Sequence, residues 1–252
     1  MDEDRSAISS MQAITISREY GSGGGEIAAR LATRLGWQLI DHEVVVRVAE
    51  ELGVSEAEAE EYDERTESIV SRILTSLQAI PPTIPVAPPV LVTTDARAYN
   101  KARHRVIEGA VATGHVVIVG RAAQVLLAAR RDVLHVRVVA PLDKRIVYVM
   151  QREGLDQTAA RARIQLKDRD RTRYLQLEYN KHPGDPDLYD LVVNTSVLDL
   201  DSVVDLVSLA LERKARRIST PTGELGPATG LSRYPDQPGD FRPPESVTEP
   251  PA

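Results

Sequence analysis

SREYGSGGGEIAARLA, residues 17–32, places a glycine-rich turn between an apolar run and an amphipathic stretch. Residues 12–17 are rich in β-branched side chains, which predicts a buried strand. After the turn, apolar residues recur at helical spacing up to a glycine that predicts the helix end, as Ile27, Leu31, Leu35 and Gly36. Four of the five residues 21–25 are glycine, so backbone N–H groups can curve around a phosphate at the helix N-terminus.

The turn lacks the lysine of the usual phosphate-loop consensus, G-x-x-x-x-G-K-S/T. With Gly23 as the second glycine, the lysine position falls on Gly24 and the first glycine is replaced by Arg18. With Gly25 as the second glycine, the lysine position falls on Glu26. We expect the turn to bind phosphate with cations supplied from elsewhere, through Arg18, Gly21, Ser22, Gly23, Gly24, Gly25 and Glu26. The alternative is a flexible turn that binds no ligand.

The composition is that of an ordinary globular protein, with 42% hydrophobic and 27% charged residues among 252. A net charge of −6 and a pI near 5.5 provide no global basic field, so neither nucleic acid nor a membrane is expected as a partner. The absence of cysteine excludes disulfides and thiolate sites, and the histidines lack metal-ligand spacing, so no metal ligands are predicted. Without a signal peptide or a long apolar run, we expect a cytoplasmic protein.

Strand and helix patterns alternate along the chain. Short β-branched or apolar runs predict strands at 12–17, 37–41, 115–120, 133–140 and 189–196. Helical spacing and glycine stops predict helices at 24–35, 42–52, 55–79, 95–113, 156–178 and 201–217. This order predicts an α/β fold, a parallel sheet of about five strands with helices on both faces.

Two proline-rich stretches interrupt these patterns. Half of the 16 prolines lie in residues 219–252, where apolar periodicity is almost absent, which predicts a disordered tail. Residues 81–90, PPTIPVAPPV, predict a loop that packs partly on the body. We therefore expect an N-terminal extension at 1–10, one domain at 11–218 and the tail at 219–252. The oligomeric state stays open, with a homo-oligomer among the alternatives.

A charged stretch, IQLKDRDRTRYLQLEY at 164–179, offers the cations that the turn lacks. Guanidinium groups suit phosphate oxygens, and an aspartate can orient them, so the candidates are Arg169, Asp170, Arg171 and Arg173. The alternative is a solvated helix face with ion pairs. Arg121 and Asp41 lie at predicted strand ends, where ligands bind in open parallel sheets, and are candidate substrate-binding residues.

Several segments in order resemble the cytidylate kinase-like family, from about residue 12 to 212. They are GSGGGEIAARLATRLG, LIDHEVV, VIVGRAAQVLL, APLDKRIVYV, IQLKDRDRTRYL and YDLVVNTSVLDLDSVVDLV. The resemblance implies a phosphate-loop (P-loop) kinase-type fold, with an acceptor-side helical region at 42–113 and a lid at 154–185. It also implies that Arg169, Asp170, Arg171 and Arg173 are catalytic and that Asp41 and Arg121 bind the acceptor.

The resemblance further implies ATP-dependent phosphoryl transfer to a small phosphorylated acceptor, most simply CMP or dCMP, with ATP and Mg²⁺ as cofactors. A small-molecule nucleotide is then the expected partner. One alternative is a pseudokinase, a nucleotide-binding regulatory or interaction module with weak or lost turnover. Another keeps the chemistry and changes the acceptor, because the insertion at 55–95 has no place in a minimal cytidylate kinase. With Gly24 at the lysine position, Gly24→Lys is expected to raise the rate.

Overall fold

The computed structural model describes residues 8–41 and 96–226, and for 96–103 only the backbone. The predicted helices at 42–52 and 55–79, the proline loop at 81–90 and most of the predicted tail lie outside the described residues. The chain divides into two units, Met1–Ile218 and Ser219–Ala252. In the described part of the second unit, Thr222–Glu224 form a short 3-10 helix, η2.

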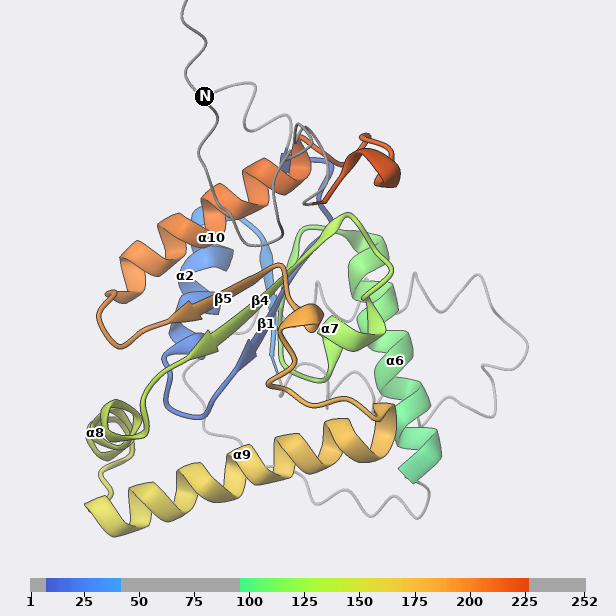
Figure 1. The fold of residues 1–252 in the computed structure, drawn as a ribbon. Helices are drawn as coiled ribbons and strands as arrows, with labels where there is room; N and C mark the ends of the chain where they lie inside the picture. Colours follow the sequence, from blue (N-terminus) through green and yellow to red (C-terminus); the bar gives the residue numbers. More distant parts are fainter. Residues whose placement is uncertain (1–7, 42–95, 227–252) are drawn as a thin grey trace, which may run out of the picture. The chain divides into compact units, whose positions relative to one another are not determined.

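A parallel sheet forms the centre of the first unit (Figure 1). Its strands, in the described residues, are β1 (Ala13–Arg18), β2 (Gln38–Ile40), β3 (Val116–Val119), β4 (Val133–Val139) and β5 (Leu191–Asn194). They are arranged in the order β2-β3-β1-β4-β5, and every pairing is parallel. The predicted α/β fold with five parallel strands is therefore confirmed. Because β1 is central, the turn that follows it lies at the middle of the carboxyl edge of the sheet.

Helices cover both faces of the sheet, as predicted (Figure 1). On one face, α2 (Gly24–Leu35) and α10 (Leu200–Ala215) pack on the strands through a core that includes Ile14, Ile16 and Leu31. On the other face, α6 (Ala96–Thr113) and α7 (Ala123–Leu126) cover a second core. Along β1, Ile14 and Ile16 enter the first core and Ala13 enters the second, because successive side chains of a strand point to opposite faces.

Local signals set most helix ends. Helix α2 stops at Gly36, whose left-handed φ of 67° lets its N–H reach the carbonyls of Ala32 and Thr33. Helix α8 (Leu142–Glu153) begins directly after Pro141, which is its N-cap residue. A short 3-10 helix, η1 (Pro186–Leu188), precedes β5.

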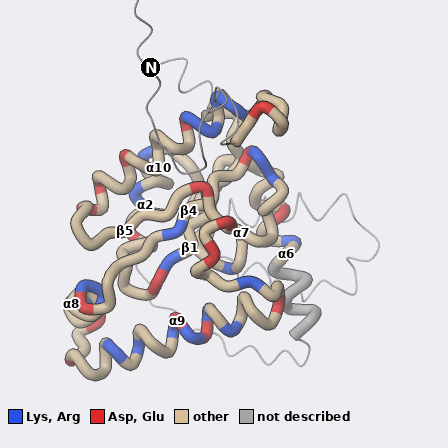
Figure 2. The backbone as a smooth tube through the Cα atoms, in the orientation of Figure 1, with Lys and Arg blue, Asp and Glu red and all other residues tan. Residues whose placement is uncertain are grey.

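Helix α9 (Gln157–Tyr179) crosses the carboxyl edge of the sheet (Figure 1). Basic and acidic residues alternate along it (Figure 2), and its buried residues are only Ala160, Ile164 and Leu175. Apolar packing therefore holds the helix weakly at its middle, and polar contacts must complete the attachment. None of the helices in the described ranges combines the length and apolar character needed to cross a membrane.

Candidate functional site

The glycine turn joins β1 to α2 and is shaped by close contacts. Gly21 and Gly23 have left-handed backbones, with φ of +83° and +80°. A Cβ at Gly21 would lie 2.9 Å from Val149 Cγ2, and one at Gly23 would lie 2.8 Å from Leu200 Cδ2. Any other residue at either position would be strained and would collide with its neighbour, so both positions require glycine.

The start of α2 offers free backbone donors. The N–H groups of Gly23, Gly24 and Gly25 make no hydrogen bond to a described residue. Such N–H groups carry the partial positive charge of the helix end and lack acceptors within the helix. An anionic oxygen is the natural partner, so the turn has the backbone features of a phosphate site.

Ser22 closes the turn, and its side chain is directed into the protein. Its hydroxyl lies 2.9 Å from the carbonyl of Glu19 and 3.1 Å from that of Val138, and the residue is 3% exposed. Thr195 also donates to the Ser22 carbonyl, over 3.0 Å. Ser22 was predicted to bind phosphate, but in the structure its side chain fastens the turn to β4.

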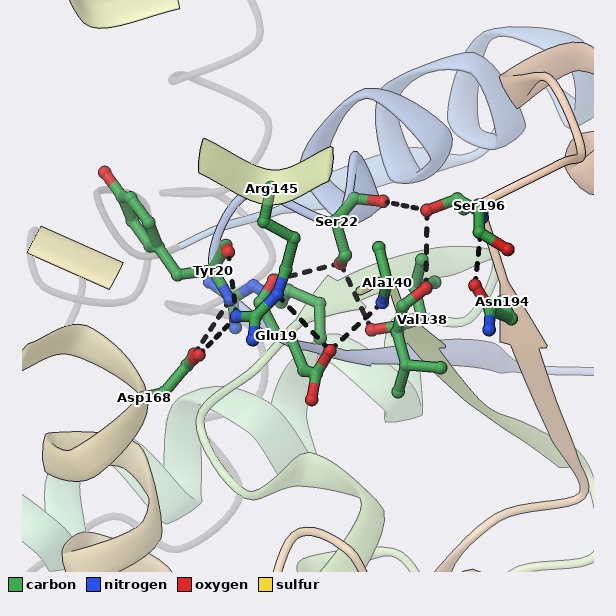
Figure 3. A network of polar contacts seen from close by, with 12 residues as sticks. Glu19, Tyr20, Ser22, Val138, Ala140, Arg145, Asp168, Asn194 and Ser196 are labelled. Carbon is green, nitrogen blue, oxygen red and sulfur yellow. Dashed lines mark hydrogen bonds and ion pairs between the residues drawn. The ribbon is translucent and has the colours of Figure 1, made fainter. Parts of the chain in front are cut away.

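A part-buried polar cluster joins the turn to α8 and α9 (Figure 3). Arg145 of α8 donates to Asp168 Oδ2 over 2.5 Å and to the Tyr20 carbonyl over 3.2 Å. Asp168 Oδ1 accepts from the Tyr20 N–H at 2.8 Å, and Glu19 Oε2 accepts from the Ala140 N–H at 3.0 Å. Arg145 Nε lies 3.6 Å from Glu19 Oε2. Side chains of α8, of α9 and of Glu19 in the turn itself thus fix the backbone of the turn.

A pocket of about 320 Å³ lies in front of the turn, and we call it the loop pocket. Six of the seven predicted phosphate-binding residues line it, all except Ser22, and Asp41 joins them from the end of β2. On its α8 side, Arg152 donates to both Glu26 Oε1 and the Tyr148 hydroxyl. Burial, together with the Glu26 carboxylate, raises the pKa of Tyr148 to about 12.

A second pocket of about 270 Å³ lies beneath α9, and we call it the α9 pocket. Four guanidinium groups line it, from Arg18, Arg121, Arg137 and Arg171. Arg18 and Arg171 line the loop pocket as well, so the two pockets meet at this pair. Arg121 follows Gly120 at the end of β3 and has a left-handed backbone, with φ of 60°.

The α9 pocket is strongly cationic. Its two carboxylates, Glu19 and Asp168, both face Arg145, which lies outside the pocket. Among described residues, Arg171 has one distant ion pair, 3.6 Å to Asp168, and the other three arginines have none. Burial, together with the nearby positive charges of Arg171 and Arg121, lowers the pKa of Arg18 to about 9. Guanidinium groups this crowded favour a bound anion.

Two buried residues at the floor of the α9 pocket, Arg137 and Gln124, were not predicted from the sequence. Arg137 is 9% exposed, donates to Ser17 Oγ over 3.1 Å and lies 5.6 Å from the centre of the Tyr189 ring. Gln124 is 3% exposed, and its side-chain amide makes no hydrogen bond within the described residues. An arginine inside the apolar run VLHVRVVA was the available signal for Arg137. Nothing in the sequence singled out Gln124.

Helix α9 brings only part of the predicted charged set to the pockets. Arg171 faces them and donates to the Arg18 carbonyl over 3.2 Å. Arg169, Asp170 and Arg173 are exposed and line neither pocket. The carboxylate that faces the turn is Asp168, three residues before Arg171 on the same face of the helix.

Comparisons of the sequence with known proteins give matches of different extent. A model described as the cytidylate kinase-like family matches residues 13–197. A cytidylate kinase of Ignicoccus hospitalis is 26% identical over 202 residues, covering 80% of this chain and 99% of that kinase. A uronate isomerase of Corynebacterium glutamicum is 37% identical over 110 residues, but the match spans only 44% of this chain and 21% of the isomerase.

Comparison with solved structures also supports the fold. An uncharacterized protein from Eubacterium ventriosum superimposes with a TM-score of 0.59 at 20% identity, covering 80% of this chain and 99% of that chain. At that identity the likeness concerns the fold alone.

Proposed function

Because the chain belongs to the cytidylate kinase-like family, we propose that it transfers the γ-phosphoryl group of ATP to a small phosphorylated acceptor. The acceptor that we place first is a pyrimidine nucleoside monophosphate, CMP or dCMP. One observation carries the proposal: two adjacent pockets meet at Arg18 and Arg171. A cytoplasmic location completes the proposal.

The two pockets suit the two partners of the transfer. ATP phosphates in the loop pocket would accept from the free N–H groups at the start of α2. An acceptor phosphate in the α9 pocket would face Arg121 and Arg171. An oxygen of that phosphate then attacks the γ-phosphorus, the bond to the β-phosphate oxygen breaks, and ADP leaves. Arg18 and Arg171, at the junction, would stabilise the charge on the transferring group.

The carboxylates of the loop pocket are compatible with Mg²⁺. Mg²⁺ in such sites takes one or two carboxylates together with substrate phosphates. Asp41 and Glu26 both line the loop pocket, and Glu26 Oε2 is buried without a hydrogen-bond partner among described residues. The ion, when bound, would neutralise phosphate charge; these two residues would hold it.

The floor of the α9 pocket would distinguish acceptors. Arg137 can donate to an oxygen of the acceptor, and the free amide of Gln124 can both donate and accept. A pyrimidine ring carries both kinds of group on its edge. An acceptor lacking them would leave buried polar groups unpaired, which costs about 1–3 kcal/mol for each group.

The test is a transfer assay. The protein is incubated with Mg-ATP and, separately, CMP, dCMP, UMP, AMP or dephospho-CoA, and phosphorylated products are separated from ADP. We expect transfer that favours a pyrimidine monophosphate, with Arg171→Ala at least about tenfold slower. Arg213→Ala, an exposed arginine of α10, is the control and should match the wild type. If dephospho-CoA is the only acceptor that is phosphorylated, the proposed phosphoryl transfer stands and the proposed pyrimidine acceptor is wrong.

The second candidate function is a pseudokinase that binds nucleotide without turnover. The observation in its favour is that glycine occupies both the lysine and the hydroxyl positions of the loop, Gly24 and Gly25. ATP binding in calorimetry, with no product from any acceptor, would select this function. The pseudokinase function would be excluded if the wild type forms product and Arg171→Ala forms none.

A further inference from the structure

The lysine position of the loop is occupied by another side chain. A Cβ built on Gly24 would lie 2.7 Å from Arg18 Cβ and 3.1 Å from Arg18 Cγ. Real Cβ atoms do not approach that closely, so a side chain at position 24 and the stem of Arg18 compete for one volume. The expectation that Gly24→Lys simply restores the missing charge conflicts with this geometry.

A second glycine accommodates the other end of Arg18. A Cβ at Gly120 would lie 2.0 Å from Arg18 Nη1, and Gly120 has a left-handed φ of +75°. The Arg18 side chain therefore runs in a slot between two positions that lack side chains, Gly24 at the start of α2 and Gly120 at the end of β3. The slot crosses the carboxyl edge of the sheet, where the two pockets meet.

The guanidinium group of Arg18 forms no ion pair with a carboxylate of the described residues. Arg18 lines both pockets, makes no ion pair in the described ranges, and lies near the positive charges of Arg171 and Arg121. Asp41 and Asp168 are the acidic groups whose fields reach it. A cation left in this position is available to a ligand that brings its own negative charge.

We propose that Arg18 is the phosphate-binding cation of this loop, exchanged for the usual lysine, and that Gly24 must lack a side chain to admit it. The inference rests on the proposed function, because it requires nucleotide phosphates in the loop pocket. It assigns the ligand class of the slot as the terminal phosphates of a nucleoside triphosphate. Arginine at position 18 and lysine at position 24 would each supply the cation that binds these phosphates, but the two side chains cannot both fit.

The experiment compares ATP affinity by calorimetry, with Mg²⁺, in the wild type and four variants: Arg18→Gln, Gly24→Lys, Arg18→Gly/Gly24→Lys and Arg18→Gln/Gly24→Lys. Arg18→Gln loses the charge and keeps most of the stem, so we expect ATP binding at least about tenfold weaker. Gly24→Lys should also bind at least about tenfold more weakly, because the lysine must displace Arg18. The Arg18→Gly/Gly24→Lys protein has both the space and a cation, and should recover to within about threefold of wild type.

Two controls separate this mechanism from general damage. Arg18→Gln/Gly24→Lys should not recover, because the glutamine stem still fills the slot. Arg213→Gln, at an exposed site outside both pockets, should bind ATP like the wild type. Circular dichroism melting checks the fold of every variant, and Arg18→Gln is the one most easily accommodated because it adds no atoms to the slot.

The outcomes distinguish this inference from the proposed function. A wild-type protein that binds no ATP would overturn the proposed function and remove the basis of the inference. If the wild type binds and Arg18→Gln binds equally well, only the inference fails. It also fails if Gly24→Lys tightens binding with Arg18 intact, or if the Arg18→Gly/Gly24→Lys protein binds no better than Gly24→Lys.

Discussion

The glycine turn and α9 face each other across the two pockets and organise charge in opposite ways. In the turn, Glu19 is the one acidic residue, and it is held by the Ala140 N–H and by Arg145. Helix α9 carries six lysines and arginines, yet only Arg171 lines the pockets. The number of charges in a segment therefore does not measure its electrostatic contribution to a site. The contribution depends on which charges the packing turns inward.

The reason lies in how each segment is attached. The turn follows the central strand, so its backbone is fixed by β1, β4 and α8 together. Helix α9 has few buried residues, and its inward face near the pockets carries the charged Asp168 and Arg171 beside the buried, apolar Leu175. Every other charge of this segment faces solvent and is screened by water and salt.

The largest expected effect concerns the cluster that joins the two regions. Arg145→Met keeps the aliphatic stem and leaves Glu19 and Asp168 without their cation. We expect the free energy of unfolding to fall by about 3 kcal/mol, as for removal of one partner of a part-buried ion pair. Urea denaturation measures the loss. Arg34→Met, which breaks an exposed pair with Asp205, should cost at most about 0.5 kcal/mol. Equal losses would mean that the cluster does not hold the turn.

The second effect separates the arginines of α9. Arg169, Arg171 and Arg173 were all predicted from the sequence as catalytic residues. In the structure, only Arg171 lines the pockets. Arg171→Ala should weaken ATP binding at least about tenfold, which corresponds to about 1.4 kcal/mol. Arg169→Ala and Arg173→Ala should change it by less than about twofold, because exposed charges contribute little. A tenfold effect of Arg173→Ala in calorimetry would show that α9 changes its orientation when ligand binds.

The third effect tests the sheet that supports the turn. His135 of β4 contacts Thr15 Oγ1 through Nδ1 at 2.8 Å, and its Nε2 has no hydrogen-bond partner among described residues. Burial lowers the pKa of His135, Lys214 lowers it further, and Asp190 opposes the shift. Above about pH 6.5 the ring is neutral both folded and unfolded, so it contributes no pH dependence. Below that pH the unfolded chain binds a proton that the folded protein resists, and stability falls.

The measurement is thermal melting from pH 7.5 to 5.5. The wild type should lose up to about 1 kcal/mol per pH unit below pH 6.5 through this residue. His135→Gln cannot bind the proton, so its melting temperature should depend less on pH in that range. Parallel curves for the two proteins would assign the acid sensitivity to other groups.

The smallest effect concerns the second unit of the chain. Deletion of residues 219–252 should leave ATP affinity unchanged and the melting temperature within about 1 °C, because their composition provides few apolar side chains to bury. Differential scanning calorimetry of the full and shortened chains makes the comparison. A fall of several degrees would show that the second unit stabilises the first one. An account of the turn and α9 would then have to include this unit as well.

Local patterns in the sequence determined the elements of the described fold. The β-branched run at 12–17 became β1, and apolar spacing with a stop at Gly36 became α2 with the predicted bounds. Strand and helix alternation was enough for the parallel sheet, because parallel strands need crossover helices. The position of the turn at the carboxyl edge followed from the same alternation. These features depend on residues close in sequence, where period and glycine conformation decide the outcome.

Only the tertiary structure decided which side chains meet. Helix α9 has almost no apolar period, so its sequence could not indicate that Asp168 and Arg171 face inward while Asp170 and Arg173 face outward. The role of Arg145 depends on Asp168, 23 residues later. The exclusion between Arg18 and a side chain at Gly24 depends on a 2.7 Å approach across the turn. Such contacts are set by packing in three dimensions, which a one-dimensional pattern of hydrophobicity and charge does not encode.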